Sequence, residues 1–140
     1  MEFTEDKIIY EDNHLMVINK DAGLLSQEDS SGDMDVLTLV KDFIKVRDNK
    51  PGNVYLGLVH RLDRNTGGVM CLAKTSKAAS RLSEQIRKKE WDKYYLSLNE
   101  SNEALKPWQI DGEWEVYTDE LSKDEESNTS SRVKANTGKK

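Results

Sequence analysis

Ionisable residues interrupt two apolar runs of this 140-residue chain, at a place without the usual turn composition. They are His60, Arg61, Asp63 and Arg64. Nearby positive charge favours the ionised form of a carboxyl group. An ionised Asp63 therefore suits a nucleophile or a general base.

Two other interpretations fit the same residues. One is a structural cluster of ion pairs at the end of a strand, since such clusters perturb carboxylates as active sites do. The other is a metal site on His60 and Asp63. The chain offers only one further histidine, His14, and one cysteine, Cys71. The usual ligand sets need more than this, so we expect no metal.

Short apolar runs predict the strands around these residues. Runs at 8–10 and 15–18, separated by a turn-prone segment, predict a β-hairpin. Runs at 58–59 and 69–73 flank the ionisable residues and predict short buried strands. Alternating aromatic and polar residues predict one more strand over Trp91 to Leu98.

Apolar residues at three- and four-residue spacing predict two helices. Asp35 is expected as the N-cap of the first, which ends at about Arg47 and buries Leu37, Val40 and Ile44. Thr75 is expected to cap the second, whose inward residues are Ala78, Leu82 and Ile86. This element order predicts an α+β fold: a mixed, largely antiparallel sheet with two flanking helices.

The ionisable segment resembles the signature of one family of RNA-modifying enzymes. Residues 60–68 read HRLDRNTGG, which is similar to the HRLDRxTSG motif of the RNA pseudouridine synthases of the large-subunit ribosomal and tRNA type. Residues 8–24 resemble the family's opening hairpin and its Asn-Lys-Pro-x-Gly loop. Residues 73–79 and 93–96 resemble the helix start and the Lys-x-Tyr strand that follow the motif.

Two positions depart from the family pattern. Asp21 stands where the family usually has proline, and Gly67 where it usually has serine. The first change is expected to loosen a loop, and the second removes a hydroxyl beside the site. Both changes leave Asp63 in place.

The resemblance implies isomerisation of uridine to pseudouridine in ribosomal or transfer RNA, without a cofactor. Asp63 would attack the ribose of a flipped-out uridine or remove a proton from it. Tyr95, the second expected catalytic residue, would stack against the uracil and serve in the later proton removal. Arg61 would fill the gap that the base leaves. Other RNA contacts are expected from His60, Arg64, Thr66, Lys20 and Lys93.

The charge distribution agrees with an RNA partner although the net charge is -5. Residues 60–93 hold nine basic and four acidic side chains, a balance of +5, between two acidic flanks. Such a concentration favours phosphate contacts, although an ordinary solvated helix face would carry similar charges. We expect neither DNA nor a membrane as partner. One cysteine and no long apolar run predict a cytoplasmic protein.

The end of the chain carries weaker signals. Residues 112–117 can form a short strand, and the polar residues 122–140 predict a tail or an exposed hairpin. We therefore expect a partial catalytic domain at 1–121 and a tail at 122–140. In the family, a Gly-Lys-Lys like that at 138–140 leads into the second half of the catalytic domain, with the arginine that pairs with the catalytic aspartate.

Two alternative functions follow. An incomplete catalytic domain is consistent with a catalytically inactive remnant that binds RNA or another protein through the basic segment 60–93. The second alternative is an unrelated metal-dependent nuclease or hydrolase that uses His60 and Asp63.

Overall fold

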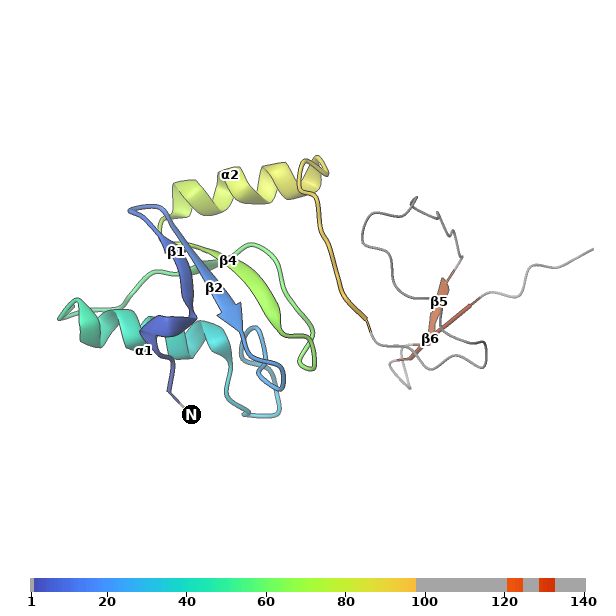
Figure 1. The fold of residues 1–140 in the computed structure, drawn as a ribbon, viewed down its shortest axis with the longest axis horizontal. Coiled ribbons are helices and arrows are strands. Elements are labelled where there is room, and N and C mark those ends of the chain that lie inside the picture. The colour runs from blue at the N-terminus through green and yellow to red at the C-terminus, as the bar shows by residue number, and fades with distance from the viewer. Residues whose placement is uncertain (1, 98–120, 125–128, 133–140) are drawn as a thin grey trace, which may run out of the picture. The chain divides into compact units, whose positions relative to one another are not determined.

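A computed structural model describes residues 2–97, 121–124 and 129–132. The chain divides into two compact units, residues 1–95 and 96–140. The first unit (Figure 1) contains a 3-10 turn at Glu5–Lys7 followed by β1 (Ile8–Glu11), β2 (Leu15–Lys20), α1 (Val36–Arg47), β3 (Gly57–Leu58), β4 (Gly68–Ala73) and α2 (Ser76–Arg87). In the second unit β5 (Leu121–Asp124) pairs in antiparallel fashion with β6 (Thr129–Arg132).

The first unit is built on a four-stranded sheet with the order β1-β2-β4-β3. All its neighbouring strands are antiparallel. The long pairing of β2 with β4 sets Leu15 opposite Ala73 and Lys20 opposite Gly68. The expected hairpin at 8–18 and the α+β fold are confirmed. The strand expected at 58–59 is found one residue earlier.

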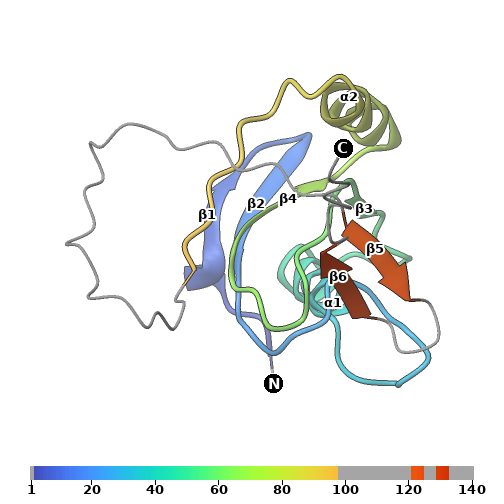
Figure 2. The same cartoon turned by 90° about the vertical axis from the view of Figure 1, so that its right-hand side faces the viewer.

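Alternation along the two central strands sets the core. Side chains two residues apart along a strand point to the same face of the sheet. On the face that packs against α1, β2 and β4 contribute Met16, Ile18, Met70 and Leu72, and all four are fully buried. The matching residues of α1 are Val36, Val40 and Ile44. Figure 1 shows α2 above the strands and α1 at their lower end, and in Figure 2 α2 again lies above α1.

Both predicted helix caps are confirmed. The Asp35 carboxylate accepts a hydrogen bond from the Thr38 backbone N–H at 2.9 Å. The Thr75 hydroxyl accepts one from the Ala78 N–H at 3.1 Å. Each cap satisfies a backbone donor that the first helical turn leaves without a partner. Of the inward residues expected on α2, Ala78 is buried, and the two that follow at four-residue spacing are half-buried.

The strand predicted over Trp91 to Leu98 is wrong where it can be judged. Residues 91–97 have no regular secondary structure, and Leu98 lies outside the described residues. Tyr94, Tyr95 and Leu96 are 77%, 64% and 81% exposed. Alternation produces a strand only where a neighbouring strand supplies hydrogen bonds, and no described strand lies beside this segment. The strand considered at 112–117 also lies outside the described residues.

No helix in the described ranges has the length and apolar composition that crossing a bilayer requires.

Candidate functional site

The candidate acid lies on the loop between β3 and β4. Asp63 and Arg61 are exposed there, whereas Leu62 between them is 8% exposed and belongs to the hydrophobic core. The Thr66 backbone N–H donates to the Asp63 carbonyl at 3.0 Å and closes a turn. The buried leucine thus anchors the loop, and the neighbouring carboxylate faces solvent.

Lys20 lies beneath this loop. It is 1% exposed, and its ammonium donates to the carbonyls of Leu24 at 2.7 Å, Asp21 at 3.0 Å and Arg64 at 3.3 Å. Burial lowers the pKa of Lys20, while the charges of Asp21 and Asp63 act in the opposite direction. The residue predicted to contact RNA therefore joins the loop after β2 to the backbone next to Asp63.

Ser26 contacts the same loop at Leu62, the residue before Asp63. Its hydroxyl donates to the Leu62 carbonyl at 2.6 Å and accepts from the Leu62 N–H at 3.1 Å. Ser26 is 6% exposed and lies 36 residues away in the sequence. Our reading of the sequence missed it, because one serine beside two leucines gives no periodic or motif signal.

His60 is half-buried and contacts the sheet. Its Nε2 accepts a hydrogen bond from the Cys71 backbone N–H at 2.9 Å, which leaves the ring proton on Nδ1. The ring lies edge-on to Trp91, with centroids 5.5 Å apart. Burial, together with the positive charge of Lys93, lowers the pKa of His60. The imidazole therefore extends the pairing of β4 beyond the end of β3.

The two arginines of the motif differ in their surroundings. Arg64 donates to the Asp33 carboxylate at 2.7 Å and to the Gly23 carbonyl at 3.2 Å. Arg61 is exposed and forms no ion pair with any residue that the structure describes. Of these two guanidinium groups, that of Arg61 is therefore open to a ligand.

The structure brings only part of the predicted set together. The loop of Asp63 and Arg64 meets Lys20, and the charge of Lys93 acts on His60. Thr66 is half-buried and closes the turn after Asp63 through its backbone. Tyr95 lies in the segment after α2, and in the described part of the chain no hydrogen bond or ring contact joins it to Asp63.

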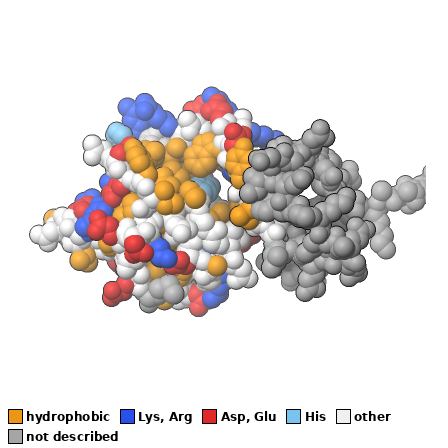
Figure 3. All heavy atoms as spheres, in the orientation of Figure 1, with side chains coloured by type: hydrophobic (Ala, Val, Ile, Leu, Met, Phe, Trp, Pro, Cys, Tyr) orange, Lys and Arg blue, Asp and Glu red, His pale blue; other side chains and the backbone are white. Residues whose placement is uncertain are grey.

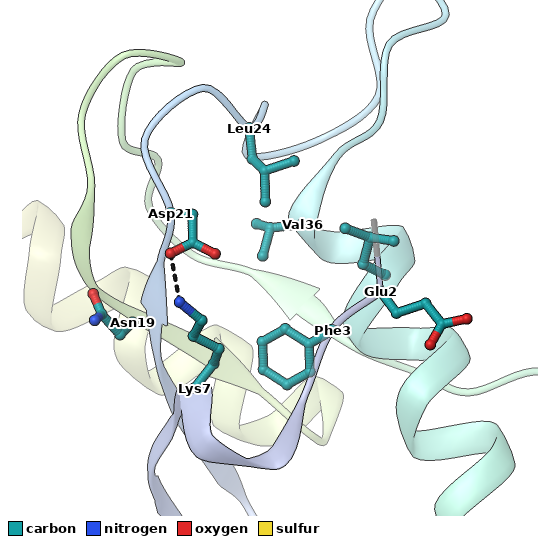
Figure 4. A pocket seen from close by; sticks show the side chains of 8 residues that line it. Glu2, Phe3, Lys7, Asn19, Asp21, Leu24 and Val36 are labelled. Atoms are coloured by element: carbon teal, nitrogen blue, oxygen red, sulfur yellow. Dashed lines mark hydrogen bonds and ion pairs between the residues drawn. The ribbon is translucent and has the colours of Figure 1, made fainter.

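The two departures from the family pattern have local explanations. The Asp21 carboxylate accepts from the Lys7 ammonium at 2.6 Å, and Figure 4 shows these two side chains pointing at each other beside a cavity of about 20 Å³. That volume holds about one water molecule, so the cavity is too small for a substrate. A Cβ on Gly67 would lie 3.2 Å from the Lys20 carbonyl oxygen and from the Ala22 nitrogen. Gly67 thus allows the two loops to approach closely.

Part of the surface of the first unit is apolar. Ile9 and Tyr10 of β1 are 56% and 52% exposed, and Val69, close to the Asp63 loop, is 64% exposed. Figure 3 shows apolar side chains gathered below α2 and over the strands. Over the described ranges, no three His, Cys, Asp or Glu side chains converge as a metal site would require.

Comparison with known proteins identifies the family. A family described as RNA pseudouridylate synthase matches residues 14–140. Ribosomal large subunit pseudouridine synthase C of Buchnera aphidicola subsp. Acyrthosiphon pisum is 41% identical over 93 residues, which are 66% of this chain and 28% of the relative. The protein of the same name from Escherichia coli O6:H1 is 36% identical over 112 residues, covering 80% of this chain and 30% of the relative.

A solved structure agrees with these matches. Human RNA Pseudouridylate Synthase Domain Containing 4 superposes with a TM-score of 0.52 at 30% sequence identity, over 61% of this chain and 31% of that protein. The chain thus spans less than a third of the length of these relatives. Because the family match extends over nearly the whole sequence and includes the Asp63 loop, the chain belongs to the RNA pseudouridylate synthase family.

Proposed function

We propose that this chain takes part in the conversion of uridine to pseudouridine in RNA, with Asp63 as the catalytic carboxylate. Membership of the family supports the reaction class, and the names of its relatives support large-subunit ribosomal RNA as the substrate. The observation that carries the proposal is the placement of Asp63, whose side chain is exposed while the backbone on both sides of it is hydrogen-bonded to buried groups.

The reaction breaks the bond between uracil N1 and ribose C1′ and joins C1′ to uracil C5. A carboxylate starts it either by attacking C1′ or by removing a proton from C2′. N1 gains a proton and C5 loses one, so the product is an isomer and no electrons are exchanged with a cofactor. Asp63 suits both starting steps because its carboxylate faces solvent and its loop is anchored.

The uridine must leave its stack to reach this carboxylate, which costs a few kcal/mol. Arg61 is suited to occupy the vacated position, since its guanidinium is exposed and forms no ion pair within the described part of the chain. Tyr95 offers an exposed ring against which the uracil can stack. Arg64 is held by Asp33 in an exposed pair, and exchanging that carboxylate for a phosphate would cost little.

A binding-only role is the second candidate. The chain spans less than a third of the length of its relatives. Under this alternative, residues 60–93, with their balance of +5, would bind RNA without base exchange.

Release of tritium from RNA labelled at uracil C5 distinguishes the two functions, because that tritium leaves only when C5 forms its new bond. We would compare the chain with Asp63→Asn on large-subunit ribosomal RNA, and repeat the comparison on transfer RNA. The matched control is Asp42→Asn, an exposed carboxylate on α1. RNA affinity is measured in parallel for all three proteins.

The proposal expects release by the wild-type chain and by Asp42→Asn, and a fall of about 10³-fold or more in Asp63→Asn, with RNA affinity unchanged. Binding without release by a folded wild-type chain would support the binding-only function. Equal release from wild type and Asp63→Asn would exclude Asp63 as the catalytic group.

A further inference from the structure

We infer that Ser26 is a positioning residue, which sets the direction of Asp63 by fixing the backbone directly before it. The inference rests on the proposed role of Asp63. Ser26 acts through Leu62 and has no contact of its own with the carboxylate.

The contact is reciprocal. The Ser26 hydroxyl donates to the Leu62 carbonyl at 2.6 Å and accepts from the Leu62 N–H at 3.1 Å. One buried side chain thus supplies the hydrogen-bond partners of both the Leu62 N–H and the Leu62 carbonyl, which a neighbouring strand would otherwise provide. β3 ends at Leu58, so the loop has left the sheet before it reaches Leu62.

A second anchor lies on the other side of the acid. The Arg64 carbonyl accepts from the Gly23 N–H at 2.7 Å and from the Lys20 ammonium at 3.3 Å. Asp63 is therefore the one residue between two fixed peptide groups, and both anchors come from the segment 20–26. Such a frame limits the directions in which the exposed Asp63 side chain can point.

The rate of the reaction depends steeply on the direction of the Asp63 carboxylate. A carboxylate that attacks C1′ or takes a proton from C2′ must approach within about 3–3.5 Å along a defined line. Loss of the Ser26 hydroxyl would leave a buried N–H and a buried carbonyl without partners. The loop would then relax, and the orientation of Asp63 would broaden while the carboxylate itself remains.

The test compares Ser26→Ala with Thr75→Val. Thr75 also contributes one hydroxyl to a backbone N–H, but at the cap of α2. Both variants are expected to lower the urea midpoint. Ser26→Ala is expected to lower kcat for tritium release by about 10–100-fold, the range found when a supporting residue around a site is lost. Its KM should change by less than about threefold, since the groups that contact RNA remain.

Amide hydrogen exchange provides a readout that does not depend on activity. The Met70 and Ile18 amides of the sheet report the loss of global stability in each variant. In Ser26→Ala the Leu62 and Thr66 amides are expected to gain about tenfold or more in exchange rate relative to these sheet amides. In Thr75→Val they should show no such relative gain. If Ser26→Ala does not fold, Ser26→Cys replaces it, since a thiol of similar shape bonds only weakly.

The outcomes separate the two ideas. A wild-type chain that releases no tritium defeats the proposed reaction, and Ser26 is then judged by exchange alone, where a relative gain in Leu62 and Thr66 exchange supports its anchoring role. The absence of this relative gain in Ser26→Ala overturns the inference. So does an equal kcat for Ser26→Ala and Thr75→Val in an active protein, because Ser26 would then act only on stability.

Discussion

Replacement of Lys20 by methionine should reduce folding stability and leave RNA binding intact. Methionine keeps the apolar stem and removes the ammonium, which is 1% exposed and donates to three backbone carbonyls. A hydrogen bond to a charged group contributes about 1.5–3 kcal/mol. Burying the ammonium costs several kcal/mol, so the net contribution is smaller than the sum of three such bonds.

We expect Lys20→Met to lower the free energy of unfolding by about 2–4 kcal/mol. That is a large part of the roughly 5–15 kcal/mol typical of a whole domain. With a urea slope of about 1–2 kcal/mol per molar, the midpoint should fall by about 2 M. Far-UV circular dichroism at pH 7 follows the transition, and the matched control is Lys77→Met, an exposed lysine on α2, with an expected change within about 0.5 kcal/mol.

RNA affinity of Lys20→Met, measured below its unfolding transition, should stay within about twofold of wild type, because a buried ammonium makes no phosphate contact and adds little to the salt dependence of binding. A stability loss below about 1 kcal/mol together with weaker RNA binding would refute this reasoning. Lys20 would then contact RNA, as its place at the end of the first hairpin suggested.

Two further predictions concern pH. Glu11 contacts Arg47 at 2.6 Å, which is the main reason why its pKa falls to about 2. Its stabilising effect is therefore complete above about pH 4.5 and is lost as the pH falls toward 2. Partial solvent exposure of the pair limits its contribution to the free energy of unfolding to about 1–2 kcal/mol. In urea titrations at pH 7, Glu11→Gln should therefore be about 1–2 kcal/mol less stable than the wild type. Between pH 4.5 and 2 the variant should not show the loss of stability that comes from protonation of Glu11. Burial lowers the pKa of His60, and a protonated Nε2 no longer accepts from Cys71. The stability of the wild type should therefore fall as the pH drops below about 6.5. His60→Gln should not show this fall, because its amide oxygen can still accept the hydrogen bond from Cys71. Thermal melts at several pH values test this, and identical pH profiles for the two proteins would contradict the role of His60.

Much of the first unit followed from local sequence alone. The hairpin at 8–18 and both helices were predictable because apolar spacing and caps act over a few residues, as at Asp35 and Thr75. The prediction of a strand from Trp91 was wrong because a strand does not form from local sequence alone. Its alternation is local, but strand formation requires a neighbouring strand. Residues 91–97 have no regular secondary structure, and Tyr94 and Tyr95 are exposed.

The residues of the candidate site could be named without coordinates. The motif at 60–68 identified Asp63 and its arginines, since their types and order are visible without coordinates. Tertiary structure alone decided how that site is held. Lys20 is buried under the loop, and Ser26 reaches Leu62 from 36 residues away. Burial and long-range hydrogen bonds depend on where the chain returns in space, and no local pattern encodes that return.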